Sequence, residues 1–476
     1  MYNKKSIIFL ISNLLSSFFP FLTIIIYTHL LSAQDYGVYY LTYSSATFIY
    51  SITVGTLGLA VLRFWPTATK EHKQTLYTTL YFLTYTALII ISLSMLMFSI
   101  FTDTPITYLI LFTMIIYISY SLIQFKLMFI RSTYRPYTYG ALHIARTGFS
   151  LIFGILLYFR YSLYGILAGI FLGHFLACLL LIFERQDKEK LKFQLINKKL
   201  IKDLLIYSIP LTLNSTLMYI MSYSDRWLLT FLASIKSAGL YIAAYTLPSQ
   251  ILIAIMMGMH LNLYPKDICA YETGSAKKTK AQLADHWTQL LAIVIPSCIG
   301  LIILRNNLIT HVLGTSFSAT AIGLLPWIIL AVFFGGIKIY YVDIALCLAK
   351  KTFMQIYICV IIAIINILLN IILIPKFDLY GSIIALIISN FLAFLLSYFL
   401  GSQFVQIPLL LWRLWKIVLS TLIMAIVLYY IKNWSGWLYL VLQIIIGISI
   451  YCIVFLILNY QAIYGIILKN RSRMTA

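Results

Sequence analysis

Three basic side chains lie inside long apolar stretches of the chain, namely Arg146, Arg226 and Lys338. An ionised group in the middle of a bilayer costs about 3 kcal/mol, so such groups mark binding sites or water-filled paths by default. Guanidinium and ammonium groups are the natural partners of phosphate and carboxylate groups. These residue types therefore predict a site that binds an anion within a membrane.

Polar residues at helical spacing accompany the three cations. From His143 to Gly154, polar or small residues recur at i, i+3, i+4, i+7 and i+11, which is one face of a helix. Similar stripes begin at Asn13 and at Asn214, and Tyr341 shares a helix face with Lys338. We expect these faces to line a central cavity that binds the substrate. The predicted lining comprises Arg146, Lys338, Arg226, Asp225, His143, Asn13, Asn214 and Tyr341.

The sequence offers little for metal, redox or covalent chemistry. The six cysteines are scattered, mostly inside apolar runs, without a CxxC pair or the spacing of metal ligands. We interpret them as small hydrophobic residues. We therefore expect no catalytic residue, no metal site and no cofactor.

The composition indicates a membrane protein. Of the 476 residues 62% are hydrophobic and 10% are charged, whereas a soluble protein carries about 25% charged residues. The net charge of +21 could suggest a nucleic-acid partner. The preference of basic residues for the cytoplasmic loops of membrane proteins explains it better, so we expect the lipid bilayer and no nucleic acid as a partner.

The apolar runs predict an all-α integral membrane protein with about 14 transmembrane helices. About 20 apolar residues cross a bilayer, and lipid-exposed backbone must be helical. The first run follows Lys4 and Lys5, is too long for a signal peptide, and is interpreted as a retained helix. The predicted spans are 6–31, 38–64, 76–101, 106–130, 139–159, 163–184, 203–233, 238–263, 283–305, 320–348, 352–374, 380–400, 414–431 and 437–460.

The basic residues predict that both termini are cytoplasmic. With the N-terminus inside, 26 of the 34 basic residues fall in inner segments and 5 in outer turns. Such a bias orients membrane proteins. The largest soluble pieces would be two inner loops, at Arg185–Lys202 and Lys266–Gln282. The outer turns are short and leave no room for an external catalytic domain.

An internal repeat divides the predicted spans. The segment Leu30–Tyr43, which contains LSAQDYGVYYL, finds an echo 202 residues later at Leu232–Tyr245, and SLYG at Ser162 is echoed by DLYG at Asp378. The repeats predict two pseudo-symmetric six-helix bundles and two additional C-terminal helices, a transporter architecture. The corresponding domains are residues 1–200, including a cytoplasmic linker, 201–400, and 401–476 with a basic cytoplasmic tail.

The repeat also assigns local roles. Since Ser237 stands where the first copy has Asp35, we interpret both as turn and cap residues, with Gly37 supplying freedom in the turn. Arg146 and Lys338 would face each other across the cleft between the bundles at similar depth. Asp343 is expected near Lys350 at the inner interface.

The motifs resemble a known family. LLSAQDYGVYYL followed by GTLGLAVLRFWP at Gly55–Pro66, and NILLNIILIPKFDLYGSIIA at Asn366–Ala385, are similar to polysaccharide-biosynthesis flippases. These are the O-antigen, or Wzx-type, members of the multidrug/oligosaccharidyl-lipid/polysaccharide (MOP) exporter superfamily. The sequence departs from the family pattern at Asp378, where the family usually has Gly, and at Ser382, where it has a Gly-Ala pair.

The resemblance implies a function. A flippase of this kind moves an isoprenoid-pyrophosphate-linked oligosaccharide, an O-antigen or capsule repeat unit, from the cytoplasmic to the outer leaflet of the bacterial plasma membrane by alternating access. H⁺ or Na⁺ as a coupling ion and the polysaccharide polymerase machinery are further expected partners. The buried cations suit the pyrophosphate group.

Other functions remain open at this stage. A multidrug or small-cation exporter of the same superfamily is the closest rival, although such exporters usually carry membrane acids where this chain has Arg and Lys. A multi-pass membrane glycosyltransferase or polymerase would need a long structured outer loop, so we do not expect an enzyme. A purely structural scaffold is least favoured.

Overall fold

A computed structural model describes residues 18–180 and 191–460. Within these ranges the secondary structure is helical and contains no strand. The chain divides into two compact units, Met1–Trp227 and Leu228–Ala476, which are described one at a time.

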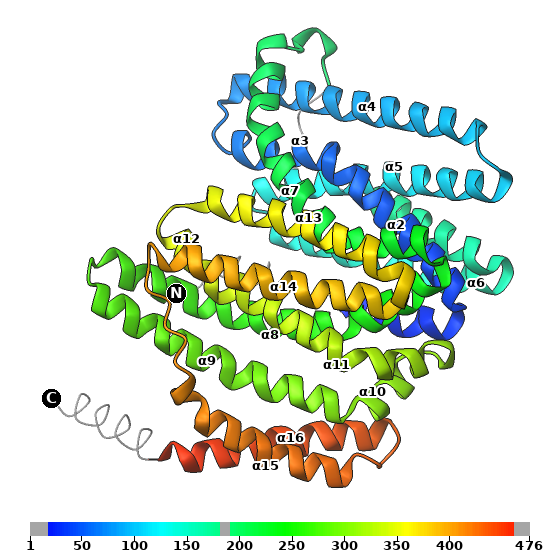
Figure 1. The fold of residues 1–476 in the computed structure, drawn as a ribbon. Helices are drawn as coiled ribbons and strands as arrows, with labels where there is room; N and C mark the ends of the chain where they lie inside the picture. Colours follow the sequence, from blue (N-terminus) through cyan, green and yellow to red (C-terminus); the bar gives the residue numbers. More distant parts are fainter. Residues whose placement is uncertain (1–17, 181–190, 461–476) are drawn as a thin grey trace. The chain divides into compact units, whose positions relative to one another are not determined.

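The first unit is built from long helices joined by short turns (Figure 1). Its helices are Phe18–Leu30, α2 (Ala33–Ile52), α3 (Val54–Phe64), α4 (Lys70–Ile100), α5 (Thr104–Ser132), α6 (Pro136–Leu180), the short η2 (Phe193–Leu195) and most of α7 (Lys198–Leu232). Helices α2 and α3 form one bent segment with an angle of 46° between them.

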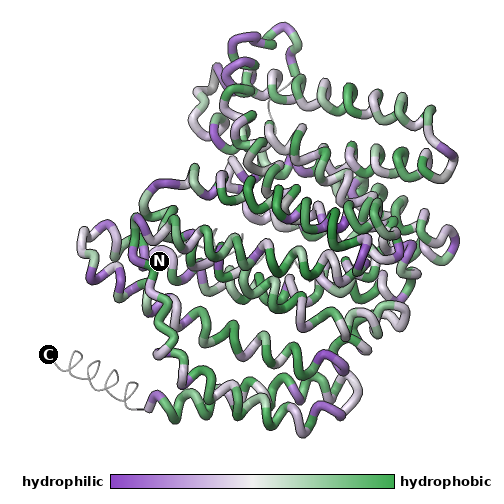
Figure 2. The backbone as a smooth tube through the Cα atoms, viewed as in Figure 1, coloured by the Kyte–Doolittle hydropathy of each residue, from purple (hydrophilic) through white to green (hydrophobic). Residues whose placement is uncertain are grey.

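The second unit continues in the same manner. Its helices are α8 (Ile235–Glu272), α9 (Ala276–Ile303), α10 (Arg305–Val312), α11 (Thr315–Ile337), the π turn η3 (Lys338–Val342), α12 (Ile344–Leu348), α13 (Thr352–Phe377), α14 (Leu379–Ser402), η4 (Leu411–Leu414), α15 (Trp415–Ile431) and α16 (Trp437–Leu458). In α15 and α16, hydrophobic residues run along the helices and hydrophilic residues gather at their connection (Figure 2).

The predicted all-α membrane fold is confirmed. Ten described helices are long and apolar enough to cross a membrane, and the bent pair α2–α3 adds an eleventh candidate. Each of the 14 predicted spans overlaps a described helix. The number of crossings and the cytoplasmic location of the termini stay predictions.

The two copies of the opening motif start a helix in the same way. Ser32 caps α2 by accepting a hydrogen bond from the Asp35 N–H at 3.1 Å, and Ser234 caps α8 by accepting one from the Ser237 N–H at 3.0 Å. Ser32 and Ser234 are therefore the N-cap residues, and Asp35 has the expected role in the turn, because its carboxylate accepts a hydrogen bond from the Ser32 hydroxyl at 2.7 Å. The expected role of Gly37 is wrong, because it lies inside α2 without a positive φ.

The SLYG and DLYG echoes form matching hairpin turns. Ser162 breaks α6 with φ 48° and ψ −128°, and Asp378 separates α13 from α14 with φ 49° and ψ −125°. Such angles favour glycine, which explains the residue that the family usually has at the position of Asp378. Here the carboxylate accepts a hydrogen bond from the Ser237 hydroxyl at 3.1 Å.

A glycine lets the helices of each hairpin approach closely. A Cβ on Gly165 would lie 2.2 Å from the carbonyl oxygen of Leu157, and a Cβ on Gly381 would lie 2.3 Å from that of Leu373. Both contacts join residues eight apart. The predicted break between spans five and six is thus confirmed. The two copies of the repeat also share the backbone conformation of their turns.

The expected loop at Lys266–Gln282 is wrong. Helix α8 continues to Glu272, α9 begins at Ala276, and Gly274 makes the turn with φ +72°. Charged residues mark where a helix leaves the lipid, but they do not end it, because a helix in water keeps its own hydrogen bonds.

Most of α7 packs on the first unit. Tyr207 contacts Phe64 with ring centroids 5.3 Å apart, and Tyr219 contacts Phe48 at 5.0 Å. Contacts divide the chain after Trp227, whereas the repeat suggested a boundary at residue 200. The three predicted domains rest on the sequence repeat and stay a prediction.

We expect Gly381→Ala to destabilise the fold by about 1–3 kcal/mol, because the new methyl group would overlap a backbone carbonyl that cannot move alone. Thermal unfolding of purified protein in detergent measures the effect. The matched control is Gly300→Ala, where an added Cβ meets no atom within 4 Å. Equal melting temperatures for the two variants would contradict the tight hairpin.

Candidate functional site

Arg146 lies in the first half of α6 and is buried, with 6% of its surface exposed. Its guanidinium lies over the Tyr120 ring, 5.2 Å from the centroid. Its Nε has no hydrogen-bond partner among the described residues. Aromatic faces attract cations, particularly away from water, so the tyrosine holds the arginine without neutralising its charge.

Helix α2 carries a stripe of tyrosines beside this arginine. Tyr36, Tyr40, Tyr43 and Tyr50 follow i, i+4, i+7 and i+14 and so share one face. Tyr43 lies close enough to the Arg146 guanidinium for the two side chains to interact electrostatically. The rings of Tyr43 and Tyr50 lie 6.2 and 5.0 Å from that of Tyr120. Sequence reasoning missed this stripe, although the helical spacing of its tyrosines was visible.

Arg226 reaches the same stripe from α7. Its guanidinium lies 5.6 Å from the ring centroid of Tyr40 and 4.7 Å from that of Tyr223. An Arg226 nitrogen also lies 3.6 Å from the Asp225 carboxylate, and both side chains are buried. Arg226 thus lies against Tyr40 of α2, whereas Arg146 lies against Tyr120 of α5. The neighbouring acid, Asp225, is a partner of Arg226.

The polar face of α6 is satisfied largely within the unit. His143 stacks on Tyr139, with ring centroids 5.6 Å apart, but its buried Nδ1 has no hydrogen-bond partner among the described residues. Thr147 donates to the carbonyl of His143, and Ser150 donates to that of Arg146. The hydroxyl groups of this face therefore bond their own helix, whereas Arg146 and His143 each keep a buried nitrogen without a hydrogen-bond partner among the described residues.

Two predicted site residues are not placed. Asn13 lies outside the described residues, and so does the side chain of Asn214, although α7 runs through that position. Their proposed roles rest on the sequence alone.

Lys338 lies in the second unit, at the start of the π turn η3, and is 6% exposed. Its Nζ lies 2.9 Å from the Asp343 Oδ2. Asp343 was expected near Lys350 at the interface, and the structure adds Lys338 as its ionic partner. Tyr341, predicted on the face of Lys338, is almost completely buried and donates a hydrogen bond to the Pro408 carbonyl at 2.8 Å.

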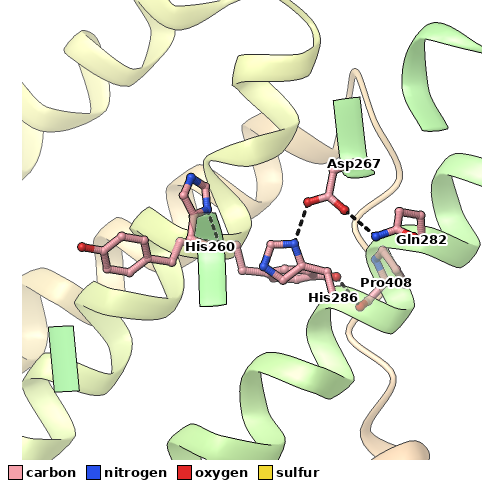
Figure 3. A network of polar contacts seen from close by, with 7 residues as sticks. His260, Asp267, Gln282, His286 and Pro408 are labelled. Atoms are coloured by element: carbon pink, nitrogen blue, oxygen red, sulfur yellow. Dashed lines mark hydrogen bonds and ion pairs between the residues drawn. The ribbon is translucent and has the colours of Figure 1, made fainter. Parts of the chain in front are cut away.

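A buried polar network fastens α8 to α9 in the second unit (Figure 3). The Asp267 carboxylate lies 2.6 Å from Nδ1 of His286 and accepts a hydrogen bond from Gln282 at 3.1 Å. Neither Asp267 nor His286 is exposed. His260 of α8 bonds the Tyr340 carbonyl nearby. Sequence reasoning missed this pair, because it assigned Asp267 to a soluble loop.

No metal-binding cluster of three or more His, Cys, Asp or Glu side chains occurs in the described ranges. The six cysteines carry no disulfide. What the described geometry offers is buried positive charge, aromatic faces and hydroxyl groups.

Comparison with known proteins identifies the family. The sequence profile described as "Polysaccharide biosynthesis protein" matches residues 3–266, more than half of the chain. The chain belongs to this family. A comparison with curated protein sequences finds no match.

Solved structures share the fold of this family member. The lipid II flippase MurJ in an inward closed conformation superposes with a TM-score of 0.79 at 19% identity, over 96% of this chain and 100% of that one. An inward-facing multidrug resistance MATE family transporter of the MOP superfamily gives 0.59 at 12% identity, over 82% and 94%. A MOP superfamily transporter from Pyrococcus furiosus gives 0.54 at 13%, over 83% and 94%. The fold is thus that of multi-pass membrane transporters.

We expect Asp267→Ala to destabilise the protein by about 1–3 kcal/mol, because it leaves buried His286 without its hydrogen-bond partner. Thermal unfolding in detergent measures the loss. The control is Asp285→Ala, which breaks an ion pair to Arg413 whose side chains are 59% and 36% exposed and should cost about 0–1 kcal/mol. A similar loss of stability in both variants would contradict a stabilising role for the buried contact between Asp267 and His286.

Proposed function

We propose that the protein is a flippase. It translocates an isoprenoid-pyrophosphate-linked oligosaccharide, an O-antigen or capsule repeat unit, from the cytoplasmic to the outer leaflet of the bacterial plasma membrane. The observation that carries the proposal is Arg146, a buried guanidinium that lies over the ring of Tyr120 and has no carboxylate partner among the described residues. Family membership and the flippase-like fold support it.

The chemistry of the first unit suits both parts of such a headgroup. Arginine binds phosphate oxygens in a bidentate manner, and desolvation makes this contact stronger. Tyrosine rings stack on sugar faces, and their hydroxyl groups bond sugar hydroxyls. The stripe on α2 places Tyr40 beside Arg226, and its Tyr43 and Tyr50 contact the Tyr120 ring over which Arg146 lies. We propose that pyrophosphate binds the arginines and that sugars extend along the stripe.

The membrane potential favours export of this substrate. Moving one charge through 100 mV changes the free energy by about 2.3 kcal/mol, so two negative charges moving outward gain about 4–5 kcal/mol. We propose that Lys338 is the residue of the second unit that binds the pyrophosphate. Alternating access then carries the headgroup across the membrane. H⁺ or Na⁺ coupling, and delivery to the polymerase machinery, belong to the same proposal.

A multidrug or small-cation exporter is the second candidate, favoured by the likeness of fold to MATE family transporters. Such a substrate would need an unneutralised acid. The buried acids Asp225, Asp267 and Asp343 each face a cation or a histidine, which argues for an anionic substrate. The transporter family and fold likewise argue against an enzyme.

We expect Arg146→Ala to reduce translocation at least tenfold, because the pyrophosphate loses a charge-assisted partner. Lys338→Ala should do the same, and protein folding and membrane insertion should persist. A leaflet-resolved assay of lipid-linked oligosaccharide in a flippase-deficient strain measures translocation.

Arg160→Ala, which removes an exposed arginine, serves as the matched control and should retain activity. Full complementation of the flippase-deficient strain by both the Arg146→Ala and the Lys338→Ala variants would contradict the proposal. Export of small cations with no flipping would instead support the exporter.

A further inference from the structure

The pairing of Lys338 with Asp343 depends on an irregular turn. In an α-helix, residues five apart point in directions about 140° apart, so their side chains would not meet. Here the segment is a π turn, closed by a hydrogen bond from the Asp343 N–H to the Lys338 carbonyl at 2.9 Å. This wider turn brings both side chains to one side. Single π turns within helices are frequent at functional sites.

The ion pair is incompletely satisfied. The Lys338 and Asp343 side chains are only 8% and 12% exposed, and Nζ bonds one carboxylate oxygen at 2.9 Å. The other oxygen, Oδ1, is buried and has no hydrogen-bond partner in the described part of the chain. A buried pair offsets its desolvation only when the remaining groups are also bonded. Stability alone therefore does not explain why the pair is present.

The neighbours hold the turn through its backbone. Gln355 of α13 donates to the Asp343 carbonyl oxygen at 3.1 Å, not to its carboxylate. On α8, His260 bonds the Tyr340 carbonyl. Cys359 of α13 lies near both charges. Within the described ranges, Lys338 is the ionic partner of the Asp343 carboxylate, so loss of this one contact releases the acid.

We propose that Asp343 is an exchangeable counter-ion, which the substrate's pyrophosphate displaces from Lys338. The inference rests on the proposed function, because it takes Lys338 as part of the pyrophosphate site. In the empty carrier, the acid neutralises Lys338 away from water. When pyrophosphate replaces it, the turn relaxes towards α geometry and the carboxylate rotates away.

This arrangement makes Asp343 a specificity-determining residue. A ligand must bind Lys338 better than the built-in carboxylate does. A pyrophosphate carries more charge than one carboxylate and passes this threshold, whereas a neutral or weakly charged lipid does not. On release, the acid returns to Lys338 and speeds departure of the product.

The test is Asp343→Asn, which keeps the shape and removes the charge. A short isoprenyl pyrophosphate serves as the probe. We expect its Kd to fall about tenfold, because the competitor is gone, while translocation of the lipid-linked oligosaccharide slows about tenfold, because release is no longer assisted. Asp343→Glu should restore both values towards wild type. A purely structural residue would weaken binding and transport together.

Thermal unfolding supplies a second readout. The Asn variant leaves Lys338 buried without an anion and should melt below wild type, and the pyrophosphate probe should recover most of this loss. Asp285→Asn, at an exposed carboxylate, should change neither binding nor rescue. The proposal is overturned if the Asp343→Asn variant binds the probe no better than wild type does. It is also overturned if neither Asp343→Asn nor Asp343→Ser gives folded protein when the probe is present.

The same measurements distinguish a failure of the flippase function from a failure of the counter-ion exchange. If wild type does not translocate lipid-linked oligosaccharide while the probe still rescues the Asn variant, counter-ion exchange holds and flipping is wrong. If wild type translocates and rescue is absent, the flippase stands and the exchange is wrong.

Discussion

A charge removed from water must find a partner inside the protein, and this requirement orders the interior of both units. Arg226 lies against Asp225, Lys338 against Asp343, and Asp267 against His286. Arg146 meets the requirement differently, through the face of the Tyr120 ring. Because aromatic partners leave the net charge in place, Arg146 is poised to attract an anion in a way that a salt-bridged cation is not. The described part of the chain thus contains two kinds of buried cation: those paired with a carboxylate, and Arg146, which lies on an aromatic ring and keeps its net charge.

Much of the fold followed from the sequence because membrane helices obey few rules. Apolar length predicted the helices, and repeated motifs predicted the matching starts of α2 and α8 and the matching turns at Ser162 and Asp378. Helix ends at charged segments were predicted less well. The α8–α9 hairpin shows why, since its helices continue past the last apolar residue.

The site was predicted in part. Buried cations are visible in a sequence because they interrupt apolar runs, so Arg146 and Lys338 were found. Their partners were not, for two physical reasons. The pairing of Lys338 with Asp343 needs a π turn, which helical periodicity does not anticipate. The tyrosines of α2 were hidden among the 37 tyrosines of the chain, most of which looked like interfacial or core residues.

The tight turns at Ser162 and Asp378 have a consequence for biogenesis. Each turn leaves almost no backbone between two long apolar helices. A glycine within one turn of the bend allows the two helices to approach closely. An isolated first helix of such a pair would carry its bend and its closely packed face into lipid without a partner. The two members are therefore suited to leave the translocon together, as preassembled hairpins. Insertion in the cell would then proceed in pairs at these two places, whatever the order elsewhere along the chain.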